Sequence, residues 1–199
     1  SSVMRNVSID IISPVINNLF EKQSFPPKPI ISVHSRDQRD TVNLIKTFYL
    51  KYPQYRWITF RDMRALSEED FAKGLQDAFV SVWIDSISGF GTFPLESMKV
   101  GVPVIGKIPN LKPSWMSEEN GIWTTNQNQI VDVIAEFIQN WLEDNISEKL
   151  YISGEETSKK YSSIENFESL VVSTFDGYLN NRLISFQEQL NKLEETIEQ

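Results

Sequence analysis

The stretch of sequence that decides the fold runs from residue 89 to residue 105 and reads GFGTFPLESMKVGVPVI. Two glycines among its first three residues allow a sharp backbone turn. Pro94 suits the first turn of a helix, where its missing N–H is not needed, so a helix is expected from Pro94 to Val100. The β-branched, apolar run Val102–Ile105 that follows is typical of a buried strand. The stretch therefore predicts a turn, a helix and a strand in succession.

The same alternation of strands and helices continues on both sides of this stretch. Apolar, β-branched runs predict strands over 29–33, 55–60 and 79–84, with a short one at 121–123. Helical spacing of apolar residues predicts helices starting at Asp40 or Thr41, at Ser67 and at Ile130. Near-continuous apolar strands that alternate with helices are typical of a parallel sheet covered on both faces. Residues 30–145 are thus predicted to form a Rossmann-like, doubly wound α/β domain with about five strands.

The two ends of the chain have a different character. Residues 1–29 include the proline-rich stretch FPPKP at 25–29 and are interpreted as a linker-like lead-in segment. Residues 146–199 are predicted to be a helical extension, with a long helix whose apolar residues follow the a/d spacing of a helical seam. That seam either docks on its own domain or meets another domain or another copy of the chain. The lack of a cap at the chain end favours the second interpretation.

Composition excludes several classes of function. The 199 residues include no cysteine and one histidine, which removes disulfides, thiolate catalysis and cysteine or histidine-cluster metal sites. The net charge of −8 argues against nucleic acid as a partner. Residues 1–125 carry 14 basic and 13 acidic side chains, whereas residues 126–199 carry 5 and 14. The predicted α/β domain is therefore close to neutral, and an anionic small molecule is compatible with it.

The loop 85–96 carries the residues most suited to chemistry. In doubly wound folds, ligands bind beyond the carboxyl ends of the strands, on loops that lead into helices. The helix that follows this loop directs free N–H groups and its positive dipole end at the loop, which suits a phosphate. Glu96 lies about one turn into that helix, where its carboxylate can accept hydrogen bonds from the two hydroxyls of a ribose. The alternative is a tight turn into a helix without any ligand.

The whole stretch 89–105 resembles the signature of retaining glycosyltransferases of family 4, which have the GT-B fold and in which it reads roughly EGFGLPxxEAMAxGxPVI. The resemblance extends over about 115 residues and implies the C-terminal, donor-binding half of such an enzyme. It implies that Glu96 binds the ribose and that no metal ion or other cofactor is needed. The turn that would give N–H groups to the phosphates or the sugar consists of Gly89, Phe90, Gly91 and Thr92.

The resemblance also assigns residues outside the turn. Arg36 follows the first strand where the family has an arginine that neutralises the diphosphate leaving group. The nucleotide base is expected against the backbone around residues 60–63, which includes Arg61 and Met63. The first glutamate of the family signature falls on Ser88, and Asp85 is the residue near enough to replace it. Arg36, Asp85 and Ser88 are therefore the candidate catalytic residues.

The function implied by this resemblance is transfer of a hexosyl group from a nucleotide diphosphate sugar to a glycan or lipid-linked acceptor, in polysaccharide biosynthesis. The chain is expected to be cytoplasmic, or peripheral at the inner membrane face, and inactive without an N-terminal GT-B domain. The alternative is a non-catalytic GT-B-like domain that assembles through its C-terminal helix. His34 is more often structural than catalytic in such a position, and Trp115 is the tryptophan expected to contact a ligand.

Overall fold

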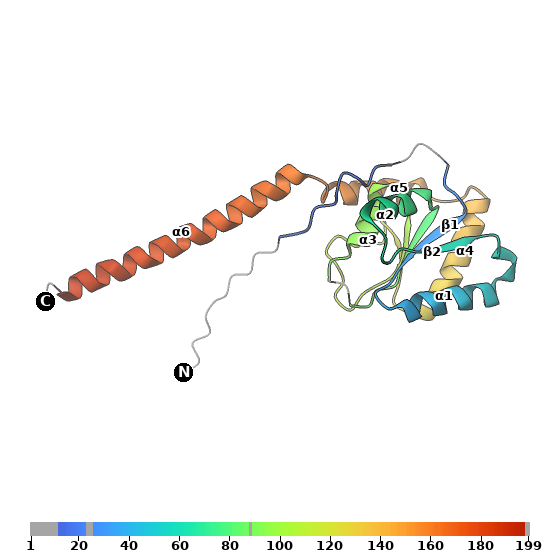
Figure 1. Ribbon diagram of the computed structural model, residues 1–199, viewed down its shortest axis with the longest axis horizontal. Helices are drawn as coiled ribbons and strands as arrows, with labels where there is room; N and C mark the ends of the chain where they lie inside the picture. Colours follow the sequence, from blue (N-terminus) through green and yellow to red (C-terminus); the bar gives the residue numbers. More distant parts are fainter. Residues whose placement is uncertain (1–11, 23–25, 88, 198–199) are drawn as a thin grey trace. The chain divides into compact units, whose positions relative to one another are not determined.

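The computed structural model describes the backbone of residues 12–22, 26–87 and 89–197 (Figure 1). The chain divides into two compact units, one formed by Ile16–Ser162 and the other by Ser1–Val15 with Ser163–Gln199. None of the described helices is long and apolar enough to cross a membrane.

The first unit contains a five-stranded parallel sheet in the order β2-β1-β3-β4-β5. This confirms the predicted Rossmann-like fold. In this sheet the strand order reverses between β1 and β3, and doubly wound folds bind ligands at such a switch point. The strands are β1 Ile30–His34, β2 Thr59–Asp62, β3 Val80–Trp83, β4 Val104–Lys107 and β5 Ile122–Thr124.

Helices cover both faces of the sheet. Figure 1 shows α1 and α4 on one face and α2, α3 and α5 on the other. Each face has its own apolar core, because side chains of a strand alternate between the two faces. The helices of this unit are α1 Gln38–Lys51, α2 Glu68–Asp77, α3 Thr92–Lys99, α4 Ile130–Leu142 and α5 Glu148–Lys159, with 3-10 turns at Pro53–Tyr55 and Gln127–Gln129.

Small polar residues let α2 and α3 approach the two central strands closely. The buried Ser32 hydroxyl of β1 donates a hydrogen bond to the carbonyl oxygen of Gly74 at 2.9 Å. The Ser97 hydroxyl of α3 donates to the hydroxyl of Ser81 of β3 at 2.8 Å. Both pairs satisfy polar groups that are cut off from water. The first pair fixes α2 against the sheet, and the second fixes α3 and the residues at its amino end.

Several boundaries differ from the sequence prediction. α1 begins earlier than expected, because Asp37 and neither Asp40 nor Thr41 is its N-cap, accepting a bond from the N–H of Arg39 at 2.8 Å. The 3-10 turn at Pro53–Tyr55 shortens the second strand at its start, so Trp57, which falls inside the predicted strand 55–60, lies outside β2 and is 47% exposed. The Ser67 cap of α2 was predicted correctly.

The compact unit is also wider than residues 30–145. Ile16 and Phe20 of the lead-in segment are buried among the side chains of α2 and α3. α5 packs on α3, where a side chain on Gly154 would meet the Cγ of Met98 at 3.2 Å. These contacts join segments that are distant in the sequence, so no local pattern predicts them. The proline-rich composition of the lead-in instead indicates a linker. The unit therefore begins at Ile16 and ends at Ser162.

The second unit contains the long helix α6, Ile164–Ile197. This confirms the predicted long C-terminal helix. Large apolar side chains along it are exposed, among them Val172, Phe175, Leu179, Leu183, Ile184 and Phe186.

Candidate functional site

The ends of β1 and β3 meet at the carboxyl edge of the sheet and bring Arg36 and Asp85 together. Asp85 directly follows the buried residue Ile84 and is itself only 5% exposed. Its Oδ1 accepts a hydrogen bond from the backbone N–H of Arg36 at 2.6 Å. The bond ties the two chain segments on either side of the topological switch point. The structure thus places two of the residues expected from the sequence in one site.

Two cations face this edge. The Arg36 side chain is 67% exposed, and its Nε lies 3.9 Å from Oδ2 of Asp85. Lys107, the last residue of β4, donates from Nζ to the hydroxyl of Ser86 at 2.7 Å. Lys107 is not among the residues expected from the sequence, although a basic residue at the end of a buried strand points to this edge. The two side chains bring positive charge beside the Asp85 carboxylate, and both can turn toward an anion.

The glycine-rich turn is held in one conformation at the start of α3. Gly91 is the N-cap residue and has a φ of 75°, in the left-handed region that favours glycine. A Cβ on Gly91 would lie 2.8 Å from Cη2 of Trp83 and 3.3 Å from Cζ2 of Trp115. Trp115 also donates from Nε1 to the carbonyl oxygen of Phe90 at 2.7 Å. The turn is thus shaped by two buried tryptophans beneath it.

The amino end of α3 is open to a ligand. No side chain of the residues described in this turn caps it, and Thr92 at its first position is exposed. The first N–H groups of a helix have no partner within the helix and carry a partial positive charge. An anionic group at this end would therefore receive hydrogen bonds from the backbone and a favourable dipole. Gly89 and Phe90 precede this end, while Ser88 lies outside the described residues.

Glu96 lies one turn further along α3 and is the most unusual carboxyl group of the site. It is largely buried, and no described residue donates a hydrogen bond to its side chain. Burial, and secondly the charge of Glu68 at the start of α2, raises the pKa of Glu96 to about 7. A buried polar group normally has a hydrogen-bond partner. The side chain therefore has acceptor capacity that a ligand hydroxyl would satisfy.

His34 packs beside the site without forming an ion pair. Its ring stacks on Phe93 with centroids 5.1 Å apart and an interplanar angle of 21°. Burial lowers the pKa of His34 and outweighs the opposing charge of Asp85, whose Oδ2 lies 3.8 Å from Nε2. The imidazole is therefore neutral at pH 7. Its buried Nδ1 has no hydrogen-bond partner among the described residues.

The side chains of Arg61 and Met63 do not lie with the other site residues at the carboxyl edge of the sheet. Nη1 of Arg61 lies 3.4 Å from Oδ2 of Asp77, at the opposite end of α2. The Met63 side chain is buried against Gly74. The nucleotide base is expected against the backbone of residues 60–63, not against these side chains. The main chain at the end of β2 therefore stays a predicted site for the base. Trp115, expected to contact a ligand, is 7% exposed and packs against Trp83.

Within residues 12–22, 26–87 and 89–197, no group of three or more histidine, aspartate and glutamate side chains could hold a metal ion.

The fold is that of the C-terminal domain of GT-B glycosyltransferases. A scan against protein-family models finds no match, and a search of curated proteins finds none either. Among solved structures, the chain is similar to the C-terminal domain of the glycosyl transferase group 1 family protein LpcC from Francisella tularensis. The TM-score is 0.55 and the identity 15%, over 72% of this chain and 96% of that one.

Two larger structures have the same fold in part of their length. Sucrose-phosphate synthase from Thermosynechococcus elongatus has a TM-score of 0.61 and 17% identity, over 88% of this chain and 53% of that one. The pneumococcal O-GlcNAc transferase GtfA, in complex with UDP and GlcNAc, has a TM-score of 0.58 and 16% identity, over 81% and 38%. This chain therefore spans about half or less of these two proteins, and at such identities the likeness establishes the fold.

Proposed function

We propose that this chain is the donor-binding half of a glycosyltransferase and binds a nucleotide diphosphate sugar at the carboxyl edge of its sheet. The observation that carries the proposal is Glu96, a partly buried carboxyl group without a hydrogen-bond donor among the described residues, one turn inside a helix that no described side chain caps. That combination offers an acceptor for hydroxyl groups next to a site for phosphate.

Each part of the donor has a matching group in the structure. The diphosphate lies at the start of α3, where it receives N–H groups from the turn and the charges of Arg36 and Lys107. The ribose hydroxyls donate to Glu96. The base lies along the main chain at the end of β2, near Met63.

The chemical step requires stabilisation of the departing diphosphate. As the bond from the sugar to the phosphate oxygen breaks, negative charge grows on that oxygen, and Arg36 and the α3 dipole stabilise it. Asp85 is buried and already accepts a bond from the Arg36 N–H, so we assign it the positioning of Arg36. Family 4, retention of configuration, a hexosyl group, a glycan or lipid-linked acceptor, absence of a metal requirement and a cytoplasmic location are further parts of this proposal.

Two solved structures guide the choice of donor. GtfA was solved in complex with UDP and GlcNAc, and the HepE protein of Anabaena in complex with UDP-glucose. UDP is therefore the first nucleotide to test. Because this chain spans about half or less of such proteins, we expect it to bind a donor without turning it over by itself.

Calorimetric titration of UDP, GDP and ADP into the 199-residue chain tests the proposal. One of them should bind, and Glu96→Gln should weaken its affinity about tenfold, the usual effect of losing a hydrogen bond to a charged group. Glu69→Gln, an exposed position on α2, is the matched control and should change nothing. Absence of binding by all three nucleotides, or equal binding by the Glu96 variant, contradicts the donor site.

One observation favours a second function. The exposed apolar side chains of α6 suit a non-catalytic domain that assembles through this helix. Sedimentation of the chain with and without residues 163–199, together with the nucleotide titration, distinguishes the two functions. Nucleotide binding by a monomer supports the first function, whereas self-association without nucleotide binding supports the second.

A further inference from the structure

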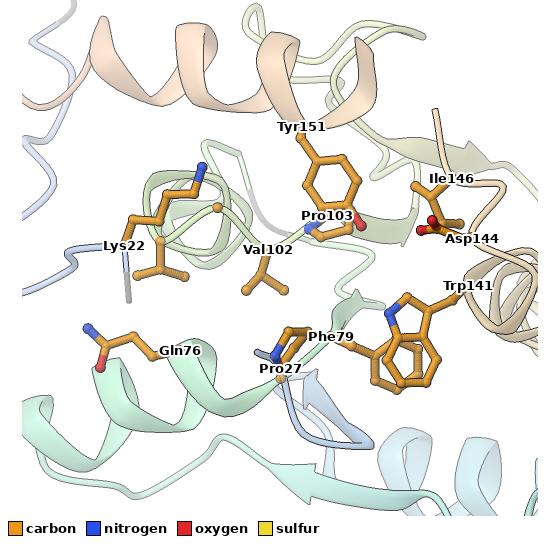
Figure 2. A pocket seen from close by; sticks show the side chains of 13 residues that line it. Lys22, Pro27, Gln76, Phe79, Val102, Pro103, Trp141, Asp144, Ile146 and Tyr151 are labelled. Atoms are coloured by element: carbon orange, nitrogen blue, oxygen red, sulfur yellow. The ribbon is translucent and has the colours of Figure 1, made fainter. Parts of the chain in front are cut away.

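A cavity of about 400 Å³ lies at the amino edge of the sheet, opposite the edge that carries the proposed donor site. Figure 2 shows the side chains that line it. Pro27, Phe79 and Pro103 come from segments that precede β1, β3 and β4, and Tyr151 comes from α5. The volume is within the range of small-molecule sites, about 300–1,000 Å³. Nothing in the proposed donor site uses this cavity.

One end of the cavity is negative and lined by aromatic rings. Trp141 and Asp144 lie at this end, and the Tyr151 ring reaches toward it from α5 (Figure 2). Trp141 stacks on Phe79 with centroids 4.5 Å apart, which fixes the indole in place. Faces of aromatic rings carry partial negative charge and attract cations. A carboxylate beside such rings is a typical arrangement for an organic ammonium group.

The end of α4 adds to the negative charge. A helix carries a partial negative charge at its carboxyl end, which a basic residue usually offsets. α3 ends on Lys99, and Lys28 bonds to Asp77 at the end of α2. α4 has no basic residue in its last turn and is followed by Glu143 and Asp144. Among the described residues, no lysine or arginine forms an ion pair with Asp144.

Tyr151 supports the same assignment. Burial, and secondly the charge of Asp144, raises the pKa of the Tyr151 phenol. Like an ordinary tyrosine, the phenol is protonated at neutral pH, and its oxygen is an uncharged acceptor beside the ring face. No described residue forms a hydrogen bond with that hydroxyl. Among the residues that line this end of the cavity, Asp144 therefore supplies the charge.

The other end of the cavity is positive. Lys22 lies there, with its aliphatic part against Gly101 (Figure 2). Its Nζ is 3.8 Å from Oε2 of Glu155, and its side chain is 66% exposed. A pair that long and that exposed is weak. Lys22 is therefore able to meet an anionic group at the mouth of the cavity.

We propose that this cavity binds a small zwitterion, with its ammonium group between Asp144 and the rings of Trp141 and Tyr151 and its anionic group at Lys22. The two opposite charges of the ligand match the two ends of the cavity, and its apolar middle meets Phe79 and Val102. The site is separate from the donor site and does not depend on it.

Titrations of phosphocholine and of choline chloride into the 15N-labelled 199-residue chain, at constant ionic strength, test this site. The indole N–H signal of Trp141 reports binding. We expect both compounds to shift it, and phosphocholine to bind more tightly. Asp144→Asn should weaken both about fivefold, because it removes the charged partner of the ammonium group at an exposed position. Glu143→Gln, which removes the neighbouring charge outside the cavity, should leave both affinities within about twofold.

Lys22→Gln separates the two ends of the site. It should weaken phosphocholine about threefold, as for an exposed ion pair, and leave choline unchanged. Trp141→Phe keeps a ring at this position and should retain part of the choline affinity, while thermal unfolding checks its fold. Absence of any choline shift, equal binding by the Asp144 variant, or a shift by methyl glucoside in place of choline would overturn the zwitterion site.

Discussion

At the scale of single residues, Glu96 is where the needs of stability and of binding conflict. The side chain is largely buried near Glu68, and the pKa of Glu96 is raised to about 7 from an ordinary value of 4.5. The folded state therefore holds the proton more tightly than the unfolded state does. A charged Glu96 costs folding free energy that a bound ribose would offset. Natural sites often retain such unfavourable groups for function.

We predict that Glu96→Gln stabilises the chain at high pH. The free energy of unfolding of the unsubstituted chain should fall as pH rises from about 4.5 to 7 and level off above, because the folded state loses a proton that it held tightly. Glutamine carries no charge, so the variant should be equally stable near pH 5 and more stable by about 1–3 kcal/mol at pH 8. Urea unfolding at both pH values checks this. A variant that is no more stable at pH 8 contradicts the raised pKa.

The same carboxyl group should make nucleotide affinity depend on pH. Ribose hydroxyls bind the charged form better, so affinity should fall by up to about tenfold from pH 8 to pH 6, as Glu96 takes up its proton. Phosphate groups titrate near pH 6 as well. The calorimetric pH profile of Glu96→Gln therefore serves as the baseline. Parallel profiles for the two proteins would exclude Glu96 from the nucleotide site.

At the scale of elements, the turn before α3 contains two glycines with different roles. Gly91 has a positive φ and no space for a Cβ beside Trp83, whereas a Cβ on Gly89 meets no atom within 4 Å. The sequence shows two equivalent glycines in the turn. The tryptophans packed beneath it make only one of them essential for the fold.

Gly91→Ala is accordingly predicted to destabilise the chain by about 1–3 kcal/mol, from left-handed strain and a clash with the Trp83 ring. Gly89→Ala, two residues away, should change the free energy of unfolding by less than about 0.5 kcal/mol. Chemical unfolding of both variants checks the difference. Equal effects would show that Trp83 moves aside and that the turn is not fixed from below.

At the scale of the whole molecule, the compact unit runs from Ile16 to Ser162, and α6 belongs to the other unit. The acidity of residues 126–199 is shared between these units, because α4 and α5 belong to the first. The carboxyl edge of the sheet nevertheless retains the cations Arg36 and Lys107. An overall acidic chain can therefore have a site for an anion.

Removal of residues 163–199 should leave the α/β unit folded. Its two apolar cores are formed by residues between Ile16 and Tyr161, so thermal unfolding should stay cooperative with a midpoint within a few degrees of that of the full chain. A chain that begins at Pro29 is the contrasting variant, because it loses the buried Ile16 and Phe20 and should be clearly less stable. Loss of cooperative unfolding after removal of 163–199 would contradict the division into units.

The sequence by itself determined the order of elements, the parallel sheet, the α2 cap at Ser67 and the turn, helix and strand of the stretch 89–105. These depend on local patterns: alternation of apolar runs, capping residues and glycine turns. The tertiary structure decided which side chains meet. It paired Arg36 with Asp85, turned Arg61 to Asp77, placed Trp115 under the turn and formed the cavity at the amino edge. Contacts between distant segments depend on three-dimensional packing, which no short pattern records.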